Sequence, residues 1–310
     1  MADITALGEL LVDFTPAGFS PAGYPLFEQN PGGAPANLLA AAAKQGLSTA
    51  FIGKVGDDMH GRFLKAAAER AGINTEGLVM DPAAATSLAF VALSDSGERE
   101  FSFIRDPGAD TLLRPNELNQ QLLRNTKVFH VGSVSLTAEP SLITAKSTGA
   151  AVSYDPNYRA SLWADDAAAC DQIRSILPIV DIIKLSQEEM PFAAGIDDVD
   201  TAIKVLRKEG VALIVITLGE GGAVVATGDQ QRSVPAFPCD AVDTTGAGDA
   251  FFGGFLSEFV KSGKSVYEVS IDDMVRFARV GCATASLCIG RRGGIPAMPT
   301  MEEVTALLNG

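Results

Sequence analysis

Residues 243–251 read Asp243-Thr244-Thr245-Gly246-Ala247-Gly248-Asp249-Ala250-Phe251, and an apolar run follows directly. Gly-Ala-Gly is too small to pack, so we expect a tight turn that opens a helix. The free N–H groups of Gly246, Ala247 and Gly248 then converge with the positive end of the helix dipole, which is a cradle for phosphate. Asp249 lies in the first helical turn, where a carboxylate can accept a proton from a hydroxyl. An anion site beside a base suits phosphoryl transfer to an alcohol.

The chain around this segment alternates short β-like runs with longer helical runs. Strands are expected at residues 4–12, 50–55, 128–131, 151–154, 182–185 and 212–217. Helices are expected at residues 34–45, 61–71, 140–148, 164–177, 199–209, 250–260 and 274–287. Several of the helices end on a glycine just before an apolar run, which is where a left-handed glycine terminates a helix. Repeated units of this kind predict an α/β fold with a doubly wound, mostly parallel sheet and helices on both faces.

Two stretches interrupt the alternation. Residues 14–31 are rich in proline, glycine and aromatic side chains. Residues 86–105 contain two β-like runs, 87–93 and 99–104, with no helical run between them, so we expect these two runs to pair antiparallel. We expect both stretches to build one small β-lid on a single domain that spans residues 1–310. The alternative is that they only extend an edge of the main sheet.

The composition is that of a globular protein. Of the 310 residues, 47% are hydrophobic and 20% are charged. No apolar run reaches the roughly 18 residues of a membrane span, and no secretory signal opens the chain, so we expect a cytoplasmic protein without membrane contact. The net charge of −14 argues against nucleic acid as a partner, because duplex binding depends on Lys and Arg. The four cysteines lack zinc-ligand spacing and are interpreted as free thiols.

A second glycine-rich motif, Asn30-Pro31-Gly32-Gly33-Ala34-Pro35-Ala36-Asn37, precedes a helical run. Adjacent glycines let the backbone approach a ligand closely, and Asn37 offers both a donor and an acceptor to a hydroxylated ligand. Taken alone, this motif is better explained as a loop with a helix cap.

Together the two motifs resemble the N-terminal and C-terminal signatures of the ribokinase-like (PfkB) carbohydrate kinase family. The resemblance runs along the whole chain and includes residues 53–58 with Gly61, 155–159, 217–222 and 292–296. It is closest to the fructokinase branch, which three stretches resemble: residues 26–35, 103–110 and 155–159 with Leu162 and Trp163.

The resemblance implies a role for each matching position. Asp249 is implied as the catalytic base, and the residues from Gly246 to Gly248 as the anion hole. The implied sugar-binding residues are Asp13, Gly32, Gly33, Asn37, Phe103, Arg105, Asn157 and Arg159. The implied nucleotide and phosphate contacts are Lys184, Glu189, Thr217, Gly219, Gly222, Ala283 and Ser286. Asp243 and Thr245 match positions that support a monovalent cation.

One departure from the family pattern affects the metal. The family often shows N-x-x-E, whose residues help to organise magnesium and the phosphates. Here Ser186 replaces the asparagine while Glu189 keeps the acid. Lys184, just ahead of it, resembles the lysine of the fructokinase branch.

The function that the resemblance implies is an ATP-dependent sugar kinase. It would transfer a phosphoryl group from MgATP to a primary hydroxyl, most simply converting fructose to fructose 6-phosphate. Ribokinase, 2-keto-3-deoxygluconate kinase and aminoimidazole riboside kinase remain open, and outside enzymes so does a non-catalytic sugar- or nucleotide-binding regulator. We expect ATP, Mg²⁺ and K⁺ as cofactors. We also expect a homodimer that covers the apolar lids.

Overall fold

The computed structural model describes residues 1–93, 99–133 and 149–310. The helix that we expected at residues 140–148 lies outside these described residues. Within the described part of the chain, none of the helices has the length and apolar composition that a membrane span requires.

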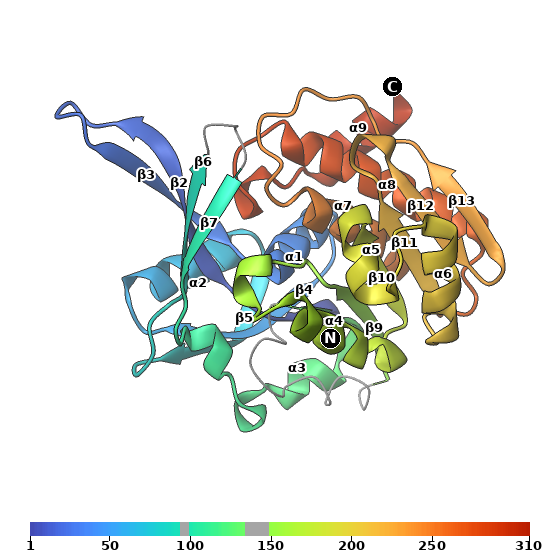
Figure 1. Ribbon diagram of the computed structural model, residues 1–310, viewed down its shortest axis with the longest axis horizontal. Coiled ribbons are helices and arrows are strands. Elements are labelled where there is room, and N and C mark those ends of the chain that lie inside the picture. The colour runs from blue at the N-terminus through green and yellow to red at the C-terminus, as the bar shows by residue number, and fades with distance from the viewer. Residues whose placement is uncertain (94–98, 134–148) are drawn as a thin grey trace.

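The main sheet is open and mostly parallel, as the repeating units predict (Figure 1). Its strands, in spatial order, are β13 (Gln230–Val234), β12 (Ala223–Thr227), β11 (Leu213–Thr217), β10 (Ile182–Ser186), β9 (Ala151–Asp155), β8 (Thr126–Gly132), β1 (Ala2–Leu7), β4 (Thr49–Gly56) and β5 (Ile73–Asp81). All neighbouring pairs from β11 to β5 run parallel, whereas β12 and β13 are added antiparallel at one edge.

Helices cover both faces of this sheet. They are α1 (Ala34–Lys44), α2 (Met59–Arg70), α3 (Gln120–Arg124), α4 (Asp166–Ser175), α5 (Met190–Ala194), α6 (Val199–Lys208), α7 (Ala247–Ser262), α8 (Ile271–Ile289) and α9 (Met301–Asn309). The side chains of β11 alternate between two cores: Leu213 and Val215 belong to one, Ile214 and Ile216 to the other. The first core contains residues of α1, α2, α7, α8 and α9, and the second contains residues of α3 to α6. The predicted doubly wound architecture is confirmed.

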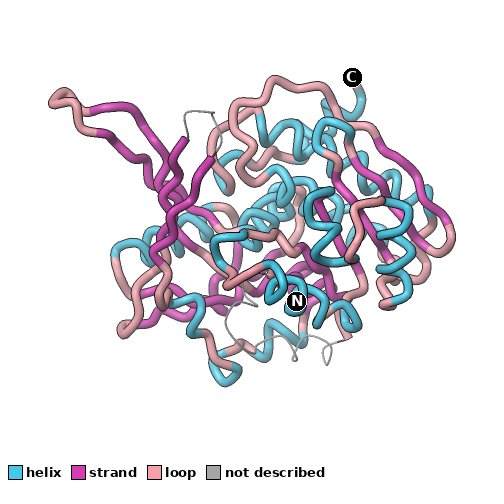
Figure 2. The backbone as a smooth tube through the Cα atoms, in the orientation of Figure 1, coloured by secondary structure: helices cyan, strands magenta, loops and turns pink. Residues whose placement is uncertain are grey.

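A second, smaller sheet projects from the body. It contains β3 (Pro25–Gly32), β2 (Leu11–Phe19), β6 (Leu88–Leu93) and β7 (Arg99–Ile104), in that spatial order. The two runs of the second stretch, β6 and β7, pair antiparallel as predicted. In Figure 2 the hairpin of β2 and β3 extends well beyond the helices.

The single strand predicted over residues 4–12 is wrong. β1 ends at Leu7, and β2 begins at Leu11 in the other sheet. Gly8 still donates its N–H to Ile52 at 3.1 Å, so the chain leaves the main sheet only after this point. The apolar pattern gives no sign of the change, because Leu10 and Val12 are buried as fully as the strand before them.

The strand order reverses beside β1. From β1 the chain adds β4 and β5 on one side, and it later adds β8, β9 and β10 on the other. In open α/β sheets a ligand crevice lies outside the carboxyl ends of the strands at such a reversal. A site is therefore expected at the segments that follow β1 and the strands beside it on the β8–β9 side.

Candidate active site

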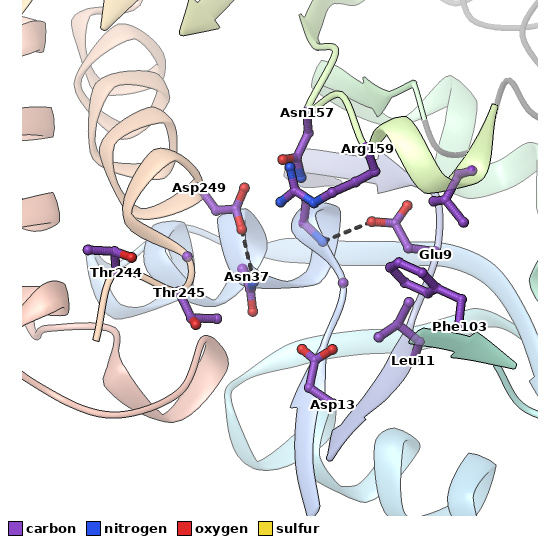
Figure 3. Close-up of a pocket in the computed structure, with 14 residues that line it drawn as sticks. Glu9, Leu11, Asp13, Asn37, Phe103, Asn157, Arg159, Thr244, Thr245 and Asp249 are labelled. Atoms are coloured by element: carbon purple, nitrogen blue, oxygen red, sulfur yellow. Dashed lines mark hydrogen bonds between the residues drawn. The ribbon is translucent and has the colours of Figure 1, made fainter. Parts of the chain in front are cut away.

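A cavity of about 280 Å³ lies at this reversal (Figure 3). Its lining comes from the segments after β1 and β9, the small sheet, and the starts of α1 and α7. The lining residues are Glu9, Leu11, Asp13, Gly33, Ala34, Asn37, Phe103, Asn157, Arg159, Leu162, Thr244, Thr245, Gly246 and Asp249. Segments far apart in the sequence thus meet in one polar cavity.

The start of α7 forms one wall. Gly246 precedes the helix with a φ of 76°, a left-handed conformation that favours glycine. The amides of Gly246 and Gly248 have no hydrogen-bond acceptor among the described residues. The prediction that all three amides are free is wrong for Ala247, whose N–H donates to the carbonyl of Thr244 at 3.2 Å. The turn that reverses the chain closes through this bond, so two amides and the helix dipole make the cradle.

Asp249 is buried beside this cradle. Its Oδ2 accepts a hydrogen bond from Nδ2 of Asn37 at 2.9 Å. Burial raises the pKa of Asp249 to about 6, and repulsion from Asp155 adds to the rise, while Asn37, Lys184 and Arg159 oppose it. The carboxylate is therefore mostly ionised at pH 7, yet close enough to neutrality to accept a proton readily.

A glycine contact brings these two helices together. A Cβ on Gly253 would lie 2.7 Å from the carbonyl oxygen of Leu38 and 2.6 Å from Cβ of Ala41. Only a glycine allows α7 to approach α1 this closely. The approach is what places Asn37 within hydrogen-bond distance of Asp249.

The loop between β3 and α1 packs against the beginning of β2. A Cβ on Gly32 would lie 2.0 Å from Oδ2 of Asp13, and one on Gly33 would lie 2.4 Å from the carbonyl oxygen of Glu9. Gly33 also has a φ of 117°. Neither position could hold a side chain without a clash. The carboxylate of Asp13 can therefore occupy the space next to Gly32 and reach the cavity.

The loop after β9 contributes Asn157 and Arg159 to the cavity. Asn157 has a positive φ of 45° and donates its N–H to Oδ1 of Asp155 at 3.2 Å. The next residue, Tyr158, donates its N–H to Oε1 of Glu189 at 2.8 Å. Oε2 of Glu189 accepts the N–H of Ser186 at 2.7 Å. Both oxygens of this acid thus hold main-chain amides and fix the loop.

Lys184 lies directly behind the amide cradle. Its Nζ is 2.9 Å from Oδ2 of Asp155, and it would be 2.8 Å from a Cβ on Gly248. Burial alone would lower the pKa of Lys184, but attraction to Asp155 and Glu189 outweighs burial and raises the pKa. The lysine is therefore a permanent buried cation next to the helix start.

Other residues implied by the sequence lie outside the cavity lining. Arg105 is paired with Asp110, with its Nη2 2.6 Å from Oδ2. Thr217, Gly219 and Gly222 lie at and just after the end of β11. Ala283 and Ser286 are buried on α8.

The predicted cation position is an ordered turn. Oδ1 of Asp243 accepts the N–H of Thr245 at 2.8 Å, and Oδ2 accepts the N–H of Gly293 at 3.1 Å. No group of three or more His, Cys, Asp or Glu side chains among the described residues could hold a metal ion.

Sequence reasoning missed several cavity residues, of which Glu9 is the most informative. Its Oε1 accepts the N–H of Ala34 at 2.9 Å, at the first residue of α1. Burial raises the pKa of Glu9 to about 7. The sequence offered one sign of its role: Glu9 is the only charged residue in the apolar run 4–12.

Comparison with known proteins agrees with this geometry. Residues 1–301 match the family model described as pfkB family carbohydrate kinase. The chain is 43% identical to probable fructokinase-4 of Arabidopsis thaliana, over 99% of this chain and 97% of that protein. A helix start with free amides beside a buried acid, at the reversal of an α/β sheet, is the arrangement that a phosphotransferase requires. The chain belongs to the pfkB family of carbohydrate kinases.

The solved structures that this fold resembles include fructokinases. The fructokinase of Xylella fastidiosa with bound ATP superposes with a TM-score of 0.91 at 33% identity, covering 100% of this chain and 99% of that one. A double mutant of the fructokinase of Vibrio cholerae O395, with fructose, ADP and potassium ion bound, gives a TM-score of 0.89 at 29% identity, covering 99% and 98%.

Proposed function

We propose that the protein is an ATP-dependent fructokinase that transfers the γ-phosphoryl group of ATP to the 6-hydroxyl of fructose. The observation that carries this proposal is the meeting of Asp249, Asn37 and the start of α7 in one cavity. The similarity to fructokinases over nearly the full length of the chain supports fructose as the acceptor.

Asp249 is the general base in this proposal. Asn37 occupies Oδ2, which leaves Oδ1 to accept the proton as the sugar oxygen attacks the γ-phosphorus. The bond from the γ-phosphorus to the bridging oxygen breaks as the new bond forms, and ADP leaves. The amides of Gly246 and Gly248 stabilise charge on the phosphoryl group, with Ala247 holding the turn and Lys184 adding positive potential from behind.

The sugar would be held by polar groups on three sides. Asp13 and Asn37 bind hydroxyls, and the backbone of Gly32 and Gly33 allows close approach. Asn157 and Arg159 supply further polar contacts from the opposite wall, and Phe103 covers an apolar face. Arg105 acts as a positioning residue here, since its guanidinium is engaged by Asp110.

The nucleotide would bind beside the carboxyl end of β11, next to α8. The proposed contacts are Thr217, Gly219, Gly222, Ala283 and Ser286, with Lys184 and Glu189 nearer the phosphates. Mg²⁺ would be held near Glu189 together with the ATP phosphates, and it would neutralise their negative charge. The turn of Asp243 and Thr245 would support K⁺, as the potassium-bound relative suggests.

The small sheet would serve as a lid and as a dimer surface. Phe19, Tyr24 and Ile104 are 75%, 71% and 59% exposed on it, and a second copy that covered them would bury this apolar area. The single domain of residues 1–310 would then close over the sugar. The four cysteines, all free thiols, support a reducing cytoplasmic location.

A coupled assay of ADP release tests the function. Fructose, ribose, 2-keto-3-deoxygluconate and aminoimidazole riboside are offered with MgATP, and we expect the highest kcat/KM with fructose. A clear preference for another acceptor would contradict the proposed sugar. Sugar binding without ADP release would indicate a regulator and not a kinase.

A further inference from the structure

Glu9 is a cavity residue whose hydrogen bonding is incomplete. Its side chain is 4% exposed and lies between the end of β1 and the start of β2. Oε1 accepts the N–H of Ala34 at 2.9 Å. Oε2 is buried and has no hydrogen-bond partner among the described residues. A buried carboxylate oxygen without a donor is destabilising, so its presence at a ligand cavity requires an explanation.

Protein groups do not neutralise this acid fully. Burial raises the pKa of Glu9 to about 7, although the backbone N–H of Glu9 itself and attraction from Arg105 oppose the rise. Arg105 makes its ion pair with Asp110, at 2.6 Å. Glu9 is thus left as an acid that a further hydrogen-bond donor would stabilise.

Glu9 and Asp249 are held by the same helix. Glu9 binds the amide of Ala34 at the first residue of α1, and Asp249 accepts its bond from Asn37 one turn later. In Figure 3, Asp249 lies next to Asn37, and Glu9 lies on the other side of the view, beside Phe103. Both acids line the same cavity, so a sugar with one hydroxyl at Asp249 can extend toward Glu9.

We propose that Glu9 is a specificity-determining residue that accepts a hydrogen bond from a hydroxyl at C1, C2 or C3 of fructose. This inference rests on the proposed function, which places the 6-hydroxyl at Asp249. Glu9 lines the cavity and the terminal torsion of a glutamate is broad, so a modest rotation of its carboxyl can expose Oε2 to a hydroxyl without breaking the bond from Ala34. A site built to bind a hydroxyl discriminates strongly against an analogue that lacks it, because the buried acceptor is then left unpaired.

Three fructose analogues test this with the wild-type enzyme. Each lacks one hydroxyl, at C1, C2 or C3, and each is assayed by ADP release at saturating MgATP. We expect one of them to raise KM about 10- to 100-fold, the value of a hydrogen bond to a charged group, with a much smaller change in kcat. If none raises KM by more than about threefold, the assignment of Glu9 is wrong, whatever happens to any variant.

The Glu9→Gln variant then assigns the effect to this residue. Glutamine keeps an acceptor for Ala34 but replaces the free oxygen with a donor. We expect KM for fructose to rise about 10- to 100-fold while KM for ATP stays unchanged. On this variant fructose and the affected analogue should have similar KM values, because the hydroxyl no longer finds its acceptor.

A matched control separates the sugar from the fold. Glu303 also accepts a main-chain amide, that of Thr300 at 2.8 Å, but it lies on α9. Glu303→Gln should leave both KM values as in the wild type. A folded Glu9→Gln variant with an unchanged KM for fructose would overturn the Glu9 assignment alone. A wild-type enzyme that releases no ADP with fructose would overturn the proposed function as well.

Discussion

Nδ2 of Asn37 donates a hydrogen bond of 2.9 Å to Oδ2 of Asp249, across the contact between α1 and α7. This bond joins the two motifs that stand at opposite ends of the sequence. It orients the carboxylate and also lowers its pKa against the larger effect of burial.

The pH dependence of turnover should report Asp249. A general base works only when it is deprotonated, and the pKa of Asp249 is raised to about 6. We therefore expect kcat at saturating sugar to fall as the pH is lowered through about 6 and to level off above pH 7, whereas protonation of Glu9, whose pKa is about 7, should act on KM. A profile that stays flat down to pH 5 would contradict the raised pKa.

Replacing Asn37 should move that profile. Asn37→Ala removes a hydrogen bond that favours the ionised form, so the acid limb should shift to higher pH. We also expect kcat to fall about 10- to 100-fold, because the base is no longer oriented. A pH titration of kcat at saturating sugar measures both effects. An unshifted acid limb would show that Asn37 does not set the pKa of Asp249.

The burial of Asp249 should cost stability at neutral pH. The folded state holds the proton of Asp249 more tightly than the unfolded state, so the contribution of this group to stability falls as the pH rises from about 4 to 6. Asp249→Asn, which cannot ionise, should stabilise the ligand-free protein by up to about 3 kcal/mol at pH 8. Thermal unfolding should show a higher Tm for the variant at pH 8 and a smaller difference at pH 5. A lower Tm at pH 8 would be inconsistent with this account.

Lys184 should matter for both stability and activity. Lys184→Met leaves Asp155 as an unpaired buried charge, which we expect to destabilise the protein by about 3–5 kcal/mol. Adding Asp155→Asn should recover part of that stability, since the carboxylate nearest to the lost lysine is then neutral, while Glu189 still lacks the lysine's charge. The double variant should still turn over slowly, because positive potential behind the cradle is lost. Full recovery of turnover would show that the pair is only structural.

Much of the architecture could be predicted from the sequence. Glycines that end helices ahead of apolar strands indicated the parallel sheet, and the absence of a helix between residues 87–93 and 99–104 indicated the antiparallel pair. The change of sheet at Gly8 could not be predicted, because apolar burial continues through Leu10 and Val12. Strands β12 and β13 were also missed, since a parallel repeat does not indicate an antiparallel edge.

The part of the site that comes from one continuous stretch of sequence could be predicted. Gly246 and Asp249 lie where the sequence places them, at the start of α7. Arg105 and Glu9 show where prediction from the sequence fails. Sequence spacing cannot reveal that Asp110 engages the arginine, or that the carboxylate after β1 turns inward to α1. Such contacts depend on which strands become neighbours.

The most direct test of the central claim is the turnover of Asp249→Asn with fructose and MgATP, measured beside its affinity for ATP. We expect kcat to fall about 10²- to 10⁴-fold, the usual value of a general base, with ATP affinity nearly unchanged. Turnover within about tenfold of the wild type would contradict the assignment of Asp249 as the base, and with it the account of the site.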